Sequence, residues 1–484
     1  MARRRLAVVL LGAAQVLVVF DTTAFAMALP WISARARMSV DGLTWLITTY
    51  SVCFAALPVL AVALGEAFGQ RRVLMGGLVL SSAAAAASGV TQDAGVLLTS
   101  RAVQGVAAAA ITAGAVALIE STHPEGRSRD RALSVHFVVV AAAGPAVVLP
   151  STMLLSTMDS GAAVFWAQAV VGALLLLLVP VALTESAPGP DARSRVGRAA
   201  AAVLPLGFLA WLADWLGDHS VSPTTITAVA VAGALTPSSL SWLGRRGDEP
   251  SLFTRLYRER AALGAYTVMA LLAACLAGAS LVLTIALQIL GGLSPESVGW
   301  ALLPAVAGLV LGWLTLPVLA ARVGLAATVA VACGMAAAGF VLLSLGGRSY
   351  HLADVLPPLL LLAYGCGVLA LPVSFTRSGS GALPRGLNSS RQLGAGLGAS
   401  LFVGVLTVVE QGTSMSYNDH KTYQAVLSGA FRDCFELGVA LALAAAAVAL
   451  LTLPWQGLRT TAPDPGVSDG APAGTAGSPG SSGR

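Results

Sequence analysis

One carboxylate stands inside an apolar segment that is long enough to cross a membrane. Asp21 lies within the apolar run from Leu6 to Leu29, and a carboxylate at the centre of a membrane helix costs roughly 2.5–3.5 kcal/mol on insertion scales. A carboxyl group in such a low-dielectric site can take up and release a proton. The sequence therefore predicts that Asp21 serves a proton, an ion or a charged ligand. The plainer alternative is that it only hydrogen-bonds helix neighbours such as Thr22 or Thr23.

Polar side chains in other apolar runs could line a cavity near this carboxylate. Gln15 and Thr22 share one helix face at 3.6 residues per turn, and Gln288 lies late in another apolar run. A buried glutamine that bonds to the backbone is the alternative at these positions. The cavity or substrate candidates are Gln15, Thr22, Thr23, Gln104 and Gln288.

These residues belong to a strongly apolar chain. Of its 484 residues, 56% are hydrophobic and 11% are charged, whereas a soluble protein carries about 25% charged residues. The composition predicts an all-α protein integral to a lipid bilayer. The net charge of +5 does not indicate a nucleic-acid partner, because basic residues of membrane proteins gather on cytoplasmic loops. The five cysteines are scattered, so no disulfide framework, metal site or cofactor is expected.

Apolar runs of about 18–24 residues, the length that a bilayer demands, predict fourteen membrane helices. Most of the 28 lysine and arginine residues fall in cytoplasmic segments if both termini are cytoplasmic, which supports this count. The basic N-terminus and first run also resemble a secretory signal peptide, but the run is long and many spans follow. The approximate spans are 6–29, 42–64, 72–91, 96–119, 132–155, 162–183, 199–217, 223–243, 262–288, 297–319, 325–345, 353–375, 393–411 and 433–454.

The spans predict four parts of the chain. Residues 1–185 are expected to form a six-helix bundle, and residues 186–260 a linker with two additional transmembrane helices and a basic interfacial segment. Residues 261–455 are expected to form a second six-helix bundle. The tail, 456–484, is rich in proline, glycine, alanine and serine, which predicts a disordered cytoplasmic segment.

Arg101 is the partner that this topology predicts for Asp21. An arginine inside a span needs a partner or must extend to the interface. Asp21 lies far along an outward-running helix, and Arg101 lies shortly after the start of an inward-running one. Both therefore fall toward the outer half of the membrane, where a direct or water-bridged pair is expected.

The residues around both charges resemble a known family. Asp21-Thr22-Thr23, followed by Ala28-Leu29-Pro30, is similar to the first-helix motif of the 14-span drug/proton antiporters of the major facilitator superfamily. Arg101-Ala102-Val103-Gln104-Gly105 matches the Arg-x-x-Gln-Gly motif of that family. The resemblance extends over roughly residues 6–455. It implies the major facilitator fold, with two six-helix bundles plus two extra helices, and a proton-coupling role for Asp21 and Arg101.

The loop after the second span resembles the signature loop of the superfamily. Residues 64–72 read Leu-Gly-Glu-Ala-Phe-Gly-Gln-Arg-Arg. The resemblance implies a cytoplasmic gate that contains Glu66, Gly69, Arg71 and Arg72, in which the acid caps a helix N-terminus or pairs with arginine across the two halves. The loop departs from the family pattern at three positions, one of which is Glu66 in place of aspartate. A short basic loop explains the two arginines equally well, but not the glycine or the acid.

Residues 143–149 in the fifth span resemble the antiporter motif of the family. Gly144 and Pro145 match it and predict a helix kink. Val148 and Leu149 occupy the place of its final glycine pair, so the close helix packing that glycine permits is not expected there. This departure leaves open whether coupling takes the form of antiport.

A polar stretch opens the thirteenth span. Asn388, Arg391 and Gln392 resemble the Arg-Gln-Leu-Gly stretch of the family, and Gly394 and Gly398 form a small-xxx-small pair that suits helix contact. Elsewhere, Glu120 and His136 lie near the cytoplasmic ends of two spans. Those two residues are expected at the membrane interface.

The expected function is proton-coupled efflux of amphipathic small molecules, such as drugs, antibiotics or a self-made natural product. The chain would act as a monomer in the cytoplasmic membrane, by alternating access. One alternative is a transport-dead sensor or assembly partner with a transporter fold. The other is a membrane enzyme that acts on lipid-linked substrates, but the five histidines are scattered and no catalytic constellation supports it.

Overall fold

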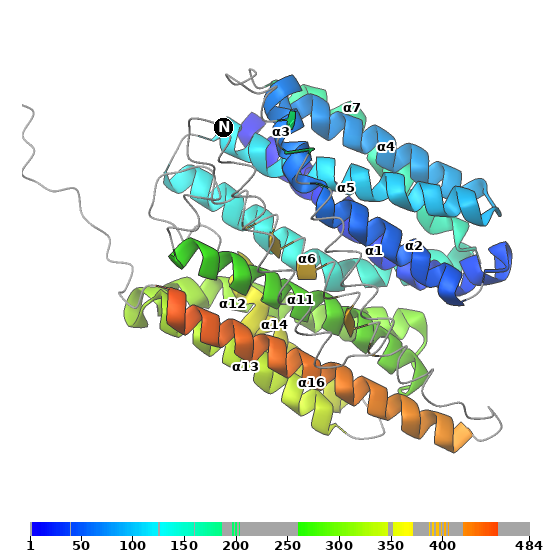
Figure 1. The fold of residues 1–484 in the computed structure, drawn as a ribbon, viewed down its shortest axis with the longest axis vertical. Helices are drawn as coiled ribbons and strands as arrows, with labels where there is room; N and C mark the ends of the chain where they lie inside the picture. The colour runs from blue at the N-terminus through cyan, green and yellow to red at the C-terminus, as the bar shows by residue number, and fades with distance from the viewer. Residues whose placement is uncertain are drawn as a thin grey trace, which may run out of the picture.

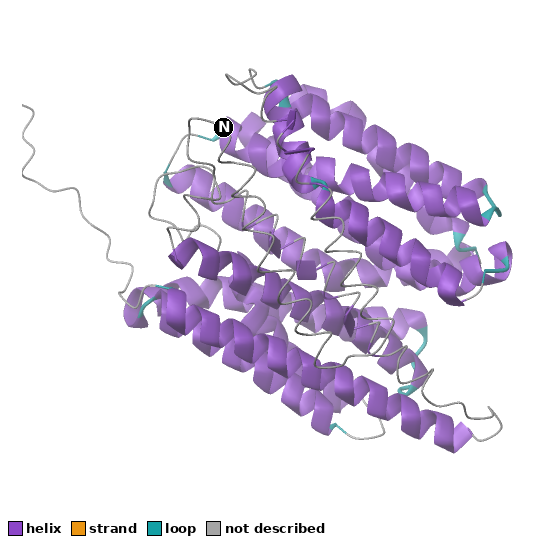
Figure 2. Ribbon diagram, in the orientation of Figure 1, coloured by secondary structure: helices purple, strands orange, loops and turns teal. Residues whose placement is uncertain are grey.

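The computed structural model describes most of residues 2–185 and 260–370, residues 420–453, and isolated residues within 196–203 and 387–405. Figure 2 shows that the described elements are helices joined by short loops. In chain order they are α1 (Ala2–Ala36), α2 (Val40–Ala56), α3 (Pro58–Phe68), α4 (Gln70–Val90), α5 (Ala94–Thr122), α6 (Arg127–Met158), α7 (Ala162–Ala182), α11 (Arg260–Ile289), α12 (Pro295–Val323), α13 (Leu325–Leu345), α14 (Leu352–Cys366), the 3-10 helix η1 (Gly367–Ala370) and α16 (His420–Thr452).

Nine helices in the described part of the chain are long and apolar enough to cross a membrane, and two shorter apolar helices accompany them. The chain is a multi-pass, all-helical membrane protein. All of the span predicted at 223–243, and most of those at 199–217 and 393–411, lie outside the described residues. The total of fourteen spans and the side of each terminus therefore stay predictions.

The helices form two groups that lie side by side. Figure 1 shows α1 to α7, in blue to cyan, above α11 to α16, in green to orange. In the first group α4 packs on α5 and α7, and α1 on α6; in the second, α13 packs on α14 and α16, and α11 on α16. The main contact between the groups joins α6 and α12. The predicted linker and tail lie largely outside the described residues, so the four-part division stays a prediction.

The second predicted span, 42–64, is interrupted in the structure. Helix α2 ends at Ala56 and α3 begins at Pro58, which occupies the first helical position. Proline has no backbone N–H and its ring crowds the preceding turn, so a helix interior does not continue smoothly through it. The span is thus two helices with a break at Leu57.

Candidate functional site

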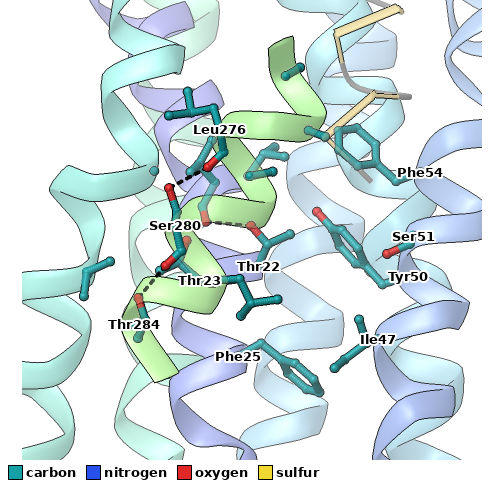
Figure 3. Close-up of a pocket in the computed structure, with 18 of the residues that line it drawn as sticks. Thr22, Thr23, Phe25, Ile47, Tyr50, Ser51, Phe54, Leu276, Ser280 and Thr284 are labelled. Atoms are coloured by element: carbon teal, nitrogen blue, oxygen red, sulfur yellow. Dashed lines mark hydrogen bonds between the residues drawn. The ribbon is translucent and has the colours of Figure 1, made fainter. Parts of the chain in front are cut away.

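A cavity of about 380 Å³ lies between the two helix groups. Its wall is largely apolar, and residues from both groups contribute to it. In Figure 3, Thr22 and Thr23 of α1 lie between α11 on one side and Tyr50 of α2 on the other. The lining includes Thr22, Thr23, Phe25, Tyr50, Phe54, Arg101, Val140, Gly144, Val148, Leu276, Ser280, Thr284 and Arg391.

A buried ion pair stands beside this cavity. The Arg101 Nη1 atom lies 3.1 Å from the Asp21 Oδ1 atom, and the two side chains are 3% and 4% exposed. A charge this deeply buried is stable only with a partner close by. Arg101 lines the cavity, whereas Asp21 does not. A ligand in the cavity would therefore contact Arg101 directly and would affect the Asp21 carboxylate only by way of this arginine.

Two aromatic rings hold the Arg101 guanidinium. Its Cζ atom lies 3.9 Å from the ring centre of Phe25 and 4.2 Å from that of Tyr50, a geometry that gives cation–π attraction. Gly105 makes the second contact possible, because a Cβ atom there would lie 2.6 Å from the Tyr50 carbonyl oxygen. The glycine of the Arg-x-x-Gln-Gly motif thus lets α5 approach α2 closely enough to place the Tyr50 ring beside Arg101.

A chain of amides extends from the ion pair. Arg101 Nη1 donates to Gln104 Oε1 at 2.9 Å, and Gln104 Nε2 donates to Gln168 Oε1 at 3.4 Å. Gln168 Nε2 in turn donates to Ser81 Oγ at 3.2 Å. The amide of Gln168 also interacts with the Asp21 carboxylate. Four helices, α1, α4, α5 and α7, thus meet at one polar network.

Gln168 and Ser81 belong to this network but were not predicted from the sequence. The available signal was a glutamine inside the apolar sixth span. A buried amide needs partners in a bilayer, so the glutamine itself was a usable signal.

The predicted cavity residues separate into two sets. Thr22 and Thr23 line the cavity, and the Thr22 hydroxyl also donates to the Val19 carbonyl at 2.8 Å. Gln15 does not line it, because its amide donates to Thr112 Oγ1 at 3.0 Å in the contact between α1 and α5. Gln15 was expected to line the cavity, but the structure places it in the packing of α1 against α5.

Gln104 and Gln288 also lie outside the cavity lining. Gln104 belongs to the amide network, as its bond to Arg101 shows. Gln288 lies at the end of α11, with its Nε2 atom 3.9 Å from the sulfur of Met27. Gln288 thus joins α11 to α1 at the edge of the cavity, since Met27 itself is a lining residue.

The loop at residues 64–72 is closed by a carboxylate that the sequence did not single out. Glu185, which follows α7, accepts a hydrogen bond from the Arg71 backbone N–H at 3.1 Å. Its carboxylate also lies 3.6 Å from Arg71 Nε and 3.7 Å from Arg72 Nε. Glu185 therefore caps the N-terminus of α4, the role expected of Glu66. These pairs join two parts of one helix group rather than the two halves of the protein.

Gly69 makes room for that carboxylate. Its φ is +104°, a conformation that residues with a side chain rarely adopt. A Cβ atom at this position would also collide with the Glu185 carboxylate. The glycine of the loop is thus explained by Glu185.

The fifth-span motif packs differently from the expectation. Gly144 lines the cavity, and a Cβ atom there would meet nothing within 4 Å. The close approach occurs instead at Leu149, whose Cα atom would lie 2.6 Å from a Cβ atom on Gly299 of α12. The small residue needed for close packing is therefore on the partner helix. Pro145 lies inside α6, which continues through it.

Two residues expected at the membrane interface are buried. His136 is 1% exposed and Glu120 is 4% exposed. The rest of the protein covers both side chains, which local sequence near a helix end does not reveal. The interface expectation was wrong for both.

Comparisons with known proteins find similar sequences over most of the chain. The profile of the Major Facilitator Superfamily matches residues 11–406. The chain is 29% identical to the puromycin resistance protein of Streptomyces alboniger, covering 94% of this chain and 91% of that protein. It is likewise 29% identical to the cephamycin export protein of Amycolatopsis lactamdurans, covering 93% and 92%.

A solved structure shares the fold. The bacterial homologue of the human lysosomal transporter Spinster, in an inward-facing and unoccupied conformation, superposes with a TM-score of 0.61. The match covers 93% of this chain and 97% of that one, at 15% sequence identity. Such low identity supports the fold alone.

Proposed function

Because this chain belongs to the Major Facilitator Superfamily, we propose that it exports amphipathic small molecules in exchange for protons. It is a transporter-type membrane protein and not an enzyme, as its family and its relatives indicate. The names of those relatives, one a resistance protein and one an export protein, support the direction of transport. We place it in the cytoplasmic membrane as a monomer that requires no cofactor.

The observation that carries the proposal is the buried ion pair beside an apolar cavity. While Asp21 is charged, it holds Arg101 at 3.1 Å. When Asp21 takes up a proton, the pair loses its charge attraction, and Arg101 then presents an uncompensated charge to the cavity it lines. Leaving one buried charge without its partner costs about 3–5 kcal/mol. Proton binding at Asp21 and substrate binding beside Arg101 would thus be coupled.

The two helix groups would supply the conformational change. Transporters of this architecture expose a central site to each side in turn as one bundle rocks against the other. The cavity between α1, α2 and α6 on one side and α11 on the other is the proposed site. The loop of Gly69, Arg71 and Arg72, closed by Glu185, would act at the cytoplasmic gate, with Glu66 beside it.

Transport in proteoliposomes with an imposed pH gradient tests the proposal, with puromycin and ethidium as probes. We expect wild type to move at least one probe against its gradient, and Asp21→Asn to lose this activity while still inserting into the membrane. Asp433→Asn is the matched control, because Asp433 is exposed on α16. Undiminished gradient-driven transport by Asp21→Asn would contradict the proton site. An inactive wild type would favour the sensor or assembly-partner alternative.

A further inference from the structure

A second arginine lines the cavity from the other helix group. Arg391 lines the cavity and is 4% exposed. Its Cζ atom lies 4.9 Å from the ring centre of Phe137, which precedes the lining residue Val140 by about one turn of α6. Arg101, the other lining arginine, has Asp21 beside it. The described lining residues include no aspartate or glutamate. Among the described lining residues, the two charged side chains are therefore both cationic, and the rest are apolar or carry a hydroxyl group.

The position of Arg391 is set by backbone packing. Gly394 and Gly398 follow it at one-turn intervals, and a Cβ atom on either glycine would collide with the backbone of α11, at Ala270 and Ala274 respectively. This close approach holds the segment against α11, whose neighbouring residue Ala273 lines the cavity. Arg391 is therefore a fixed part of the cavity wall.

His136 lies beside this arginine with its hydrogen-bonding capacity unused. It is 1% exposed, and neither ring nitrogen has a hydrogen-bond partner in the described part of the chain. The positive charge of Arg391 acts on its ring. His136 also continues the cavity-lining row of α6, since Val140, Gly144 and Val148 follow it at four-residue intervals and share its helix face. Buried donors and acceptors are costly to leave unpaired, so this ring is suited to a ligand.

We propose that Arg391 and His136 form a subsite for the carboxylate of an amphipathic acid, whose apolar body fills the rest of the cavity. A guanidinium can donate two parallel hydrogen bonds to a carboxylate, and the His136 ring can donate a third. A largely apolar pocket with a few convergent polar groups is the usual form of a small-molecule site. Transport of the acid rests on the proposed exporter function, whereas binding of the acid can be measured without any transport.

Two probes that differ only in charge test the subsite. Dansyl-phenylalanine carries a free carboxylate, and dansyl-phenylalaninamide has the same rings without the charge. We expect the full-length protein in lipid nanodiscs, measured by equilibrium dialysis, to bind the acid about tenfold more tightly, the factor of one charge-assisted hydrogen bond. Arg391→Gln should remove this preference and leave the affinity for the amide unchanged. His136→Phe should reduce the preference in part.

Arg432→Gln is the matched control, because Arg432 is exposed on α16 and pairs with Glu436. It should keep the wild-type preference. Equal affinities in wild type, absence of binding by both probes, or a preference that survives Arg391→Gln would overturn the subsite. If Arg391→Gln also loses binding of the amide, the variant has lost its fold and His136→Phe decides the question. An unchanged preference of His136→Phe for the acid overturns the proposal, and a reduced preference supports it. A preference for the acid without proton-driven transport would contradict the exporter proposal alone.

Discussion

The two helix groups differ in what they bury. The group of α1 to α7 holds the Asp21–Arg101 pair and the amides of Gln104 and Gln168. In the described residues of the second group, the buried core is apolar and includes the thiols of Cys275, Cys333, Cys366 and Cys434. Arg391 is the one charged side chain that is buried among the described residues of this group. The difference indicates that the proposed proton chemistry is concentrated in one group, and that the other mainly provides a wall against which the substrate is held.

This asymmetry has a physical basis. A change of charge at a buried site alters the free energy of every polar neighbour, so those neighbours are best kept in one rigid unit. An apolar wall is indifferent to the protonation state of Asp21. It can move past the first group with few hydrogen bonds to break, such as the one from Gln288 to Met27. Variants in the two groups should therefore separate effects on coupling from effects on packing.

The largest effect is expected for Arg101→Ala. The variant leaves the Asp21 carboxylate buried without its partner, at a cost of about 3–5 kcal/mol. Thermal unfolding in detergent should show a strongly lowered midpoint. Combining it with Asp21→Asn should restore much of the stability, because no charge is then left unpaired, but not the proton-driven transport. Wild-type stability of Arg101→Ala would show that the first group does not depend on the pair.

Two glycine variants separate helix contact from cavity lining within the first group. Gly105→Ala places a Cβ atom 2.6 Å from the Tyr50 carbonyl oxygen, and overpacking of this kind costs about 1–3 kcal/mol. Gly144→Ala is the matched control, since a Cβ atom there meets nothing within 4 Å. Unfolding midpoints should fall for the first variant and stay near wild type for the second. A reversed order would show that the closeness of α2 and α5 is not what places Tyr50.

Gln168→Leu tests whether the amide network serves coupling. It removes partners from Gln104 and Ser81, which should cost about 1–3 kcal/mol, the penalty of unsatisfied buried polar groups. We expect proton-driven transport to fall as well. Gln15→Leu makes the same chemical change at the contact with Thr112, and should lower stability while transport persists. Equal transport by both variants would argue that the network is only structural.

The smallest effect is expected in the second group, for Cys333→Ala. Cys333 is fully buried on α13, and removal of one sulfur from a packed core should cost about 1 kcal/mol. Transport rate and its dependence on the pH gradient should match wild type. A loss of proton coupling as large as that of Gln168→Leu would show that the contrast between the two groups is not functional.

Much of this protein was predictable from sequence, because the signals are local. The length of apolar runs predicts membrane helices, and the cost of a charge in hydrocarbon marks Asp21 and Arg101 as residues that need partners. The motifs around them predicted the family, which the matching profile confirms. These inferences require only the residues on either side of each position.

Tertiary structure alone decided which partner each side chain has. Glu185 pairs with Arg71, which lies 114 residues away in the sequence. Gly299, rather than a glycine of the fifth span, permits the approach of α12 to Leu149. His136 is buried beside Arg391. A helix pattern states which face is apolar but not which helix covers it. Helix packing therefore decided which residues pair in the gate, in the amide network and beside the cavity. The sequence by itself had already determined that the Asp21 carboxylate must have a partner.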